Sequence, residues 1–321
     1  MRKLLPALSA GLLLAGCATE LTSEDLAAEY YNLGNAFLEL ERYDVAVGYY
    51  QRSLGLADDA EARYNLALAL QRASRFDESL DELELLLAGD PSNALVLELQ
   101  AMAFHLSGQE QAAIEAYARI EELHPDNQVA PYNRALLLWA GGDTAQAADL
   151  LEHLLELQPD DQDILFNLAL LSSQVGESDA AAALWARYLE EDPTDAAALL
   201  ELAQVQSRRG QFAEALDTFA AAEAAMVEED PRGPLAQFER AAILLTEVED
   251  PRAGLSALRA ALLGGFRDRE RISQLLAEPD LLEREAVAAE LEEYNLAPAA
   301  GGPGDDVREG EEGQLGVSDG S

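Results

Sequence analysis

The sequence predicts an all-α solenoid built from tandem helix–turn–helix units. Four prolines, Pro91, Pro125, Pro159 and Pro193, stand 34 residues apart. A period of this length is typical of repeats that each form two packed helices. Small residues recur at two fixed places in every period, where two helices must come close together. No alternating strand pattern competes with this helical one.

The first 16 residues predict an export signal. A basic pair precedes an uncharged run over residues 4–16, which is too short for a membrane-spanning helix of about 20 residues. Cys17, the only cysteine, follows directly. The stretch Leu14-Ala15-Gly16-Cys17 resembles the bacterial lipobox, and this resemblance implies cleavage before Cys17 and attachment of lipid to its thiol. The alternative is an ordinary secretory signal that ends near a free cysteine.

The resemblance to the lipobox also implies a location. Lipoproteins with this motif carry several acyl chains, and two or more chains hold a protein stably on a membrane. We therefore expect a bacterial membrane lipoprotein that faces outward, and Ala18 favours the outer over the inner membrane where both are present. Residues 17–26 are predicted to form a lipidated tether. A lone cysteine allows no intramolecular disulfide, so packing alone must hold the exported fold.

Alignment on the prolines gives six repeats over residues 27–226, which begin near residues 27, 60, 94, 128, 162 and 196. Small residues at the eighth and twentieth places let the two helices of a unit approach closely. These places hold Gly34, Ala67, Ala101, Ala135, Ala169 and Ala203, and Ala46, Ser79, Ala113, Ala147, Ala181 and Ala215. Each proline ends a second helix because the residue before it leaves the α region. Two residues later stand predicted helix caps, namely Asn93, Asn127, Asp161 and Asp195.

The stretch YNLGNAFLELERYDVAVGYYQRSL, residues 31–54, and the period of 34 closely resemble the tetratricopeptide repeat (TPR) family. This resemblance implies a right-handed solenoid whose first helices line a groove for a peptide or helix of a protein partner. Carried over place by place, the groove residues are Tyr31, Asn32, Asn35, Tyr64, Asn65, Tyr132, Asn133, Phe166 and Asn167. Asparagine can donate to and accept from an extended backbone, and aromatic rings supply rigid contact area. The plainer alternative is that Tyr-Asn is a common filler at these places. Repeats three and six depart from the pattern, with Glu98-Leu99 and Leu200-Glu201.

After residue 226 the repeat pattern weakens. Residues 227–296 are predicted to hold a degenerate seventh pair over 235–263, with Ala242 and Gly254 at its small places, and two capping helices broken at Pro279. Terminal units of a solenoid must present a polar face to water, and the alternating acids and arginines here fit that role. Residues 297–321 are rich in glycine and acids and are predicted to be a disordered tail.

The charge excludes one class of partner. The net charge is −40, and Lys3 is the only lysine. Such a surface repels nucleic acid, so no nucleic-acid binding is expected. The clamp by which some TPR proteins hold a carboxylate uses lysines, and the chain lacks them beyond the signal. The acidity itself has two explanations, a cationic partner or adaptation to high salt.

No pattern indicates catalysis, a metal or a cofactor. His105, His124 and His153 occupy unrelated places in their repeats, and the acidic stretch 159–163 lacks the glycine and distal glutamate of a calcium loop. We therefore expect no enzyme, but a membrane-anchored interaction scaffold of the bacterial envelope that takes part in assembly of an envelope complex. The alternative is an envelope binding protein for a small ligand, a glycan or a peptide. A deep pocket with convergent polar groups would favour that alternative, whereas a long open groove favours protein binding.

Overall fold

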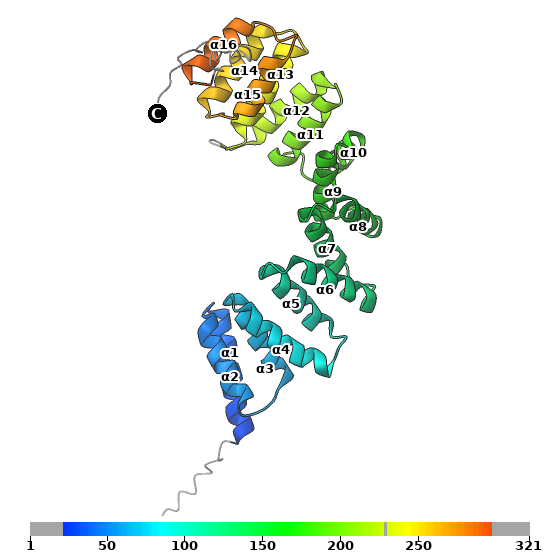
Figure 1. The fold of residues 1–321 in the computed structure, drawn as a ribbon, viewed down its shortest axis with the longest axis vertical. Coiled ribbons are helices and arrows are strands. Elements are labelled where there is room, and N and C mark those ends of the chain that lie inside the picture. Colours follow the sequence, from blue (N-terminus) through cyan, green and yellow to red (C-terminus); the bar gives the residue numbers. More distant parts are fainter. Residues whose placement is uncertain (1–21, 228–229, 297–321) are drawn as a thin grey trace, which may run out of the picture. The chain divides into compact units, whose positions relative to one another are not determined.

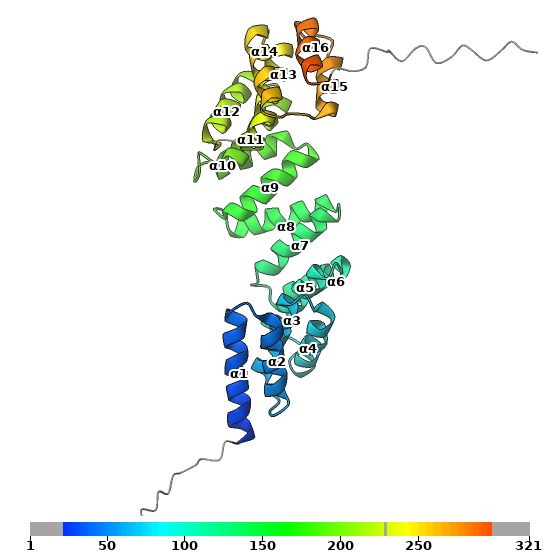
Figure 2. The same cartoon turned by 90° about the vertical axis from the view of Figure 1, so that its left-hand side faces the viewer.

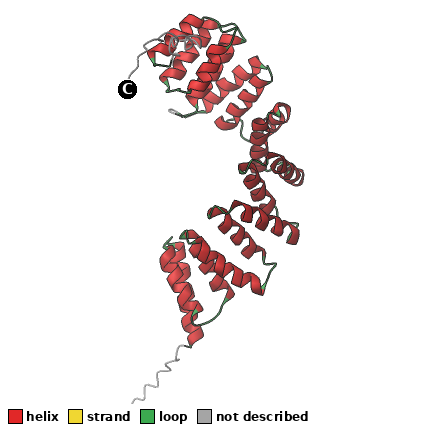
Figure 3. Cartoon of the chain, in the orientation of Figure 1, coloured by secondary structure: helices red, strands yellow, loops and turns green. Residues whose placement is uncertain are grey.

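The computed structural model describes residues 22–227 and 230–296, and this part of the chain is helical throughout (Figure 1). Its sixteen helices are joined by short loops, and the described residues form no strand (Figure 3). The predicted all-α solenoid class is confirmed. The signal, Cys17 and the predicted tail lie outside the described residues. The chain divides into two compact units, residues 1–150 and 151–321.

The helices follow one another as antiparallel pairs. The first unit holds α1 (Ser23–Glu39), α2 (Tyr43–Leu54), α3 (Ala60–Arg72), α4 (Phe76–Gly89), α5 (Ala94–Leu106), α6 (Glu110–Leu123) and α7 (Val129–Ala140). Helix α8 (Thr144–Leu157) crosses the boundary. The second unit holds α9 (Gln162–Val175), α10 (Ser178–Tyr188), α11 (Ala196–Arg208), α12 (Phe212–Ala225), α13 (Gly233–Thr246), α14 (Pro251–Leu263), α15 (Arg269–Ala277) and α16 (Arg284–Glu293).

Most first helices begin where the 34-residue register places a new repeat. Helices α3, α5, α9 and α11 start at residues 60, 94, 162 and 196. Helix α1 is an exception, because it begins at Ser23, inside the segment predicted to be a tether up to residue 26. The reason is a capping box: the Thr22 hydroxyl accepts from the Asp25 N–H at 3.1 Å, and the Asp25 carboxylate accepts from the Thr22 N–H at 2.9 Å. The boundary predicted at residue 26 is therefore too late.

The predicted caps are present. The side chains of Asn93, Asp161 and Asp195 accept hydrogen bonds from N–H groups in the first turns of α5, α9 and α11. The side-chain oxygen of Asn127 accepts from the Ala130 N–H at 2.8 Å. These bonds satisfy N–H groups that a helix start otherwise leaves unpaired.

The small places lie at close helix contacts, as predicted. All eleven alanine and serine residues there are 0% exposed, and Gly34 is buried. The one serine, Ser79, donates its hydroxyl to the carbonyl of Ala67, so its polar group is satisfied inside the core. A Cβ on Gly34 would lie only 2.5 Å from the ring of Tyr50. Larger side chains then fill the spaces between pairs, and Tyr50, Tyr117, Trp185 and Phe219 are buried there.

In the second unit the degenerate pair is α13 and α14. Helix α13 begins at Gly233, two residues earlier than predicted. In it Ala241 is fully buried, whereas Ala242, the predicted small place, is half-buried. Gly254 keeps its predicted role, since a Cβ there would lie 2.6 Å from Leu245. Helices α15 and α16 cover this pair (Figures 1 and 2). Their Ile272, Leu275, Val287 and Leu291 join the core that α13 and α14 begin.

Candidate functional site

The predicted Tyr-Asn row lies on the first helices of four pairs, α1, α3, α7 and α9. Asn32 is exposed, whereas Tyr31, Asn35, Tyr64, Asn65, Tyr132, Asn133, Phe166 and Asn167 are all half-buried. Most side chains of the row are therefore only partly accessible to a partner.

A chain of hydrogen bonds links the row between the first two pairs. The side-chain oxygen of Asn35 accepts from the Tyr50 hydroxyl at 2.7 Å and from the Asn65 amide at 3.1 Å. The same Asn65 amide nitrogen donates to the Tyr31 hydroxyl at 3.2 Å, and Tyr31 donates to Glu61 at 2.6 Å. These bonds join α1, α2 and α3, so the amides of Asn35 and Asn65 serve the contact between repeats.

The two phenols in this network stay protonated. Burial is the main cause that raises the pKa of Tyr31, and its hydrogen bond to Glu61 adds to the effect. Burial likewise raises the pKa of Tyr50 far above its usual range. Both hydroxyls are therefore fixed hydrogen-bond donors at neutral pH.

A small cavity of about 240 Å³ opens beside Tyr31, between α1 and the turn that leads into α3. Its walls include Tyr31, Ala28 and Ser53, and its rim carries three carboxylates, Glu24, Asp59 and Glu61. Asp59 also caps α3 by accepting from the Ala62 N–H at 2.8 Å. Negative charge at this end of the row favours a cationic group over an anionic one.

Repeat three departs from the Tyr-Asn pattern. Its Glu98, on α5, lies where α5 meets the turn before α7. Its carboxylate accepts from the Asn127 amide at 2.5 Å, which joins α5 to the start of α7. The pKa values of Tyr64 and Tyr117 are raised, first by burial and then by the charge of Glu98. Glu98 therefore lies near side chains of α3, α6 and α7. The sequence marked it only as an exception.

An apolar stripe on α5 was missed by sequence reasoning. Leu95, Met102 and Leu106 are 64%, 44% and 51% exposed. Their spacing of seven and then four residues puts them on one face of the helix. We call these three residues the α5 stripe. Exposed Val129 begins α7, and the turn before α7 is joined to α5 by the Asn127–Glu98 bond. A partial signal was available: the place of Leu106 holds Glu39 in repeat one and Arg72 in repeat two.

In the second unit Phe166 packs inward. Its ring lies edge-on to Trp185, with centroids 5.1 Å apart, and 5.5 Å from Tyr188. The Trp185 indole donates to the Ser173 hydroxyl at 3.0 Å. Asn167 donates to the Asp163 carbonyl in its own helix at 2.8 Å. Phe166 thus contributes mainly to packing between α9 and α10, with a part-exposed edge.

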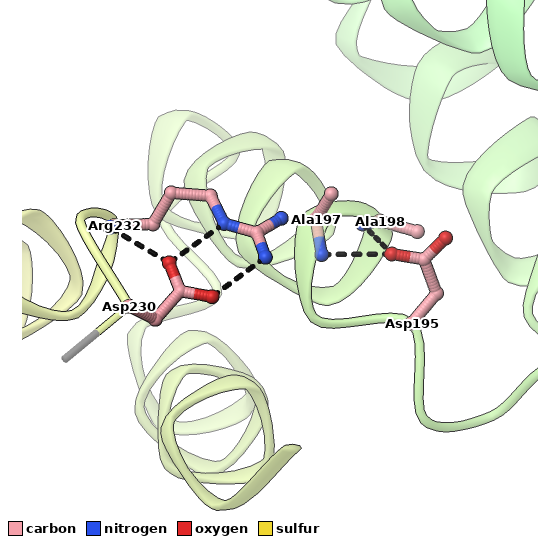
Figure 4. A network of polar contacts seen from close by, with 5 residues as sticks. All are labelled: Asp195, Ala197, Ala198, Asp230 and Arg232. Carbon is pink, nitrogen blue, oxygen red and sulfur yellow. Dashed lines mark hydrogen bonds and ion pairs between the residues drawn. The ribbon is translucent and has the colours of Figure 1, made fainter. Parts of the chain in front are cut away.

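The turn before α13, where the 34-residue period slips, is held by charge. Asp230 accepts three hydrogen bonds from Arg232, at 2.8 to 3.0 Å, and these lower the pKa of the Asp230 carboxyl to about 2. Asp195 accepts from the N–H groups of Ala197 and Ala198. The pKa of Arg232 is raised mainly by its hydrogen bond to Asp230, and the charge of Asp195 adds to this effect. Figure 4 shows the guanidinium between the two carboxylates.

A hollow of about 790 Å³ in the second unit borders this turn. Met226, Val227, Pro234 and Phe266 supply apolar walls. Its charged neighbours are engaged elsewhere: Glu223 pairs with Arg240, Asp268 caps α15, Arg267 donates to the carbonyls of Leu262 and Phe266, and Asp230 pairs with Arg232. The hollow does not present the convergent polar groups that a small-ligand site needs.

No group of three or more His, Cys, Asp or Glu side chains among the described residues is placed to hold a metal ion. None of the described helices is long and apolar enough to cross a membrane.

Comparisons with known proteins agree with this geometry. Family models described as "Tetratricopeptide repeat" match residues 31–94, 64–128, 138–194 and 184–217, which together are more than half of the chain. Sperm-associated antigen 1 of Mus musculus is 30% identical over 112 residues, 35% of this chain and 12% of that protein. An uncharacterized lipoprotein of Treponema pallidum is 30% identical over 105 residues, 32% of this chain and 53% of that protein. The chain thus spans about half or less of these relatives.

Solved structures with the same architecture share little sequence. A tetratricopeptide repeat protein from Parabacteroides merdae has a TM-score of 0.53 at 18% identity, over 78% of this chain and 96% of that one. The C-terminal part of a TPR repeat-containing protein from Cytophaga hutchinsonii reaches 0.62 at 12% identity, over 74% and 99%. YrrB, described as a TPR protein with an unusual peptide-binding site, reaches 0.50 at 19%, over 58% and 95%. At these identities the likeness concerns the fold.

Proposed function

Because this chain belongs to the tetratricopeptide-repeat family, we propose that it is a protein–protein interaction scaffold that holds a peptide or helix of its partner along the first helices of the first unit. TPR repeats generally serve as non-enzymatic binding scaffolds, and the three family-model matches cover both units.

One observation carries this proposal, the α5 stripe. Three large apolar side chains on one helix face, all about half exposed or more, are the kind of surface that a partner covers. An amphipathic helix or extended segment binds such a surface with apolar anchors at matching spacing. The Tyr-Asn row continues on either side, with Tyr64 on α3 and Tyr132 on α7.

The charge of the same helices favours a partner segment with basic residues. Glu24, Asp59 and Glu61 surround the cavity beside Tyr31 at the start of the row. An acidic rim of this kind steers a cationic segment during encounter and disfavours acidic competitors. Apolar anchors on α5 and a basic residue toward α1 together define the partner chemistry that we propose.

We further propose that lipid on Cys17 anchors the scaffold to the outward side of a bacterial envelope membrane, where it takes part in assembly of a larger complex. The lipobox-like stretch before Cys17 supports the anchor. The similarity to a Treponema pallidum lipoprotein supports it as well. Outer-membrane placement rests on Ala18 alone.

Site-specific photo-crosslinking in the native cell tests the binding surface. A crosslinking residue at Met102, within the α5 stripe, is expected to capture a discrete partner. The same residue at Leu85, which is 58% exposed on α4, is the matched control. Adding Leu95→Glu and Leu106→Glu should remove the product at Met102, because both anchors then carry charge. Equal products from Met102 and Leu85 would contradict the assignment of the surface.

A further inference from the structure

A second apolar surface lies at the start of the first unit. Leu26, Tyr30, Leu33 and Phe37 follow one another at spacings of four, three and four residues, so they form a stripe along α1. Tyr49 of α2 packs onto it, 5.2 Å from Phe37 and 6.2 Å from Tyr30 between ring centroids. We call these five residues the N-terminal face. Leu26 and Leu33 are exposed, and the three rings are half-buried.

This face points away from the second repeat. Tyr31 and Asn35, which hydrogen-bond to α3 residues, lie on a different side of α1 from the stripe. Figure 2 shows α1 at the edge of the first unit, with α2 between it and α3. At the other end of the repeat array, α15 and α16 cover the last pair, as a solenoid end requires. Among the described residues, no helix covers α1 in that way.

The N-terminal face also carries positive charge. The guanidinium of Arg52 lies 5.4 Å from the Tyr49 ring centroid and 5.9 Å from that of Tyr30. The guanidinium of Arg42 lies 5.2 Å from the Phe37 ring centroid. In a chain with 61 acidic and 21 basic residues, two arginines on one aromatic cluster are a local exception. The face therefore combines rings, leucines and cations on a surface that is otherwise acidic.

We propose that the occupant of the N-terminal face is the surface of the lipid bilayer that holds the anchor. This inference rests on the proposed lipid at Cys17. Thr22, the first described residue, stands five residues beyond Cys17, and five residues of extended chain span at most about 18 Å. The anchor thus keeps α1 within reach of the headgroups.

The chemistry of the face suits the interface between headgroups and acyl chains. Tyrosine is enriched there because its ring is apolar and its hydroxyl polar. Arginine lays its stem along apolar surface while its guanidinium reaches phosphate groups. The acidic remainder of the chain is repelled by anionic headgroups. Docking through the N-terminal face would therefore set one orientation of the first unit on the membrane.

In the test, the lipid anchor is attached to the protein by a chemical reaction. The chain from Cys17 to Ser321, which contains every described helix, is coupled through its single thiol to a maleimide lipid. The vesicles are phosphatidylcholine with a minority of phosphatidylglycerol, with or without bromine on the acyl chains. Leu33→Trp reports contact, because bromine quenches only tryptophan within the bilayer. Leu85→Trp on α4 is the matched control, and both variants carry the native Trp139 and Trp185 as background.

We expect brominated lipid to quench the added tryptophan of Leu33→Trp and not that of Leu85→Trp. Each basic residue near an anionic surface strengthens association by roughly fivefold, so Arg42→Glu with Arg52→Glu should weaken docking by roughly 25-fold or more. Arg72→Glu with Arg252→Glu reverses the charge of two exposed arginines elsewhere in the chain. This pair should leave the quenching of Leu33→Trp unchanged.

Equal quenching of the two tryptophan variants would overturn the proposal. So would a concentration-dependent shift in the emission of Leu33→Trp without lipid, since the face would then pair with a second copy of the chain. Because the coupling is chemical, the result does not depend on whether the cell attaches lipid to Cys17. Whether cells attach lipid to Cys17 is tested separately, by labelling with a fatty-acid probe.

Discussion

Replacing Gly34 by alanine tests the close approach of α1 and α2. The added Cβ would lie 2.5, 2.6 and 2.9 Å from three ring carbons of Tyr50. This ring cannot simply move, because it is 0% exposed and its hydroxyl donates to Asn35 at 2.7 Å. Overpacking of this kind typically costs about 1–3 kcal/mol. Loss of the hydrogen bond adds about 1 kcal/mol if the ring is displaced.

Gly48→Ala is the matched control. Gly48 lies within α2, and a Cβ there would meet nothing within 4 Å. Both substitutions gain about 1 kcal/mol of helix propensity over glycine. Gly48→Ala should therefore stabilise the protein by about that amount, whereas Gly34→Ala, which also loses the hydrogen bond of Tyr50, should destabilise it by about 1–3 kcal/mol. Urea unfolding followed by circular dichroism measures both. Equal stability of the two variants would refute the assigned contact between α1 and α2.

Three other predictions concern the anchor, the repeat core and the turn before α13. Cys17→Ser should abolish labelling by a fatty-acid probe and leave an uncleaved or soluble precursor; lipid on the variant would rule out the lipobox. Ala147→Leu or Ala181→Leu should lower the melting temperature by overpacking sites that are 0% exposed, while Gly310→Leu in the predicted tail should not. The pKa of Asp230 is lowered to about 2 from its usual value of 3.8, so its ion pair stabilises the fold above pH 3.8 and is lost as pH falls toward 2. Asp230→Asn should therefore lower the melting temperature at pH 7, with a difference from wild type that disappears near pH 2.

The sequence alone was sufficient for much of the fold, because every repeat presents the same local pattern. Small residues at the eighth and twentieth places predicted close contacts at Ala67 and Ala147, and both are buried. The prediction failed where that pattern is irregular. Helix α13 starts at Gly233, earlier than expected, and Ala241 is fully buried instead of Ala242.

The site was harder to predict, because its contacts join residues far apart in sequence. Asn65 bonds to Asn35 and Tyr31, 30 and 34 residues away, and the family pattern gives no hint that these amides are used within the protein. The role of Glu98 likewise depends on Asn127, 29 residues away, in the turn before α7. The α5 stripe was visible as apolar residues, but the sequence does not say which face of a helix stays uncovered.

The affinity of the captured partner for variants of the α5 stripe tests the proposed function most directly. Leu95→Glu with Leu106→Glu is compared with Leu85→Glu and Leu123→Glu, which place the same charges on exposed leucines of the second helices α4 and α6. An anchor residue typically contributes 2 kcal/mol or more, so the first pair should weaken binding by about 30-fold or more and the second by little. Equal losses from both pairs, or none from the first, would contradict binding along the first helices.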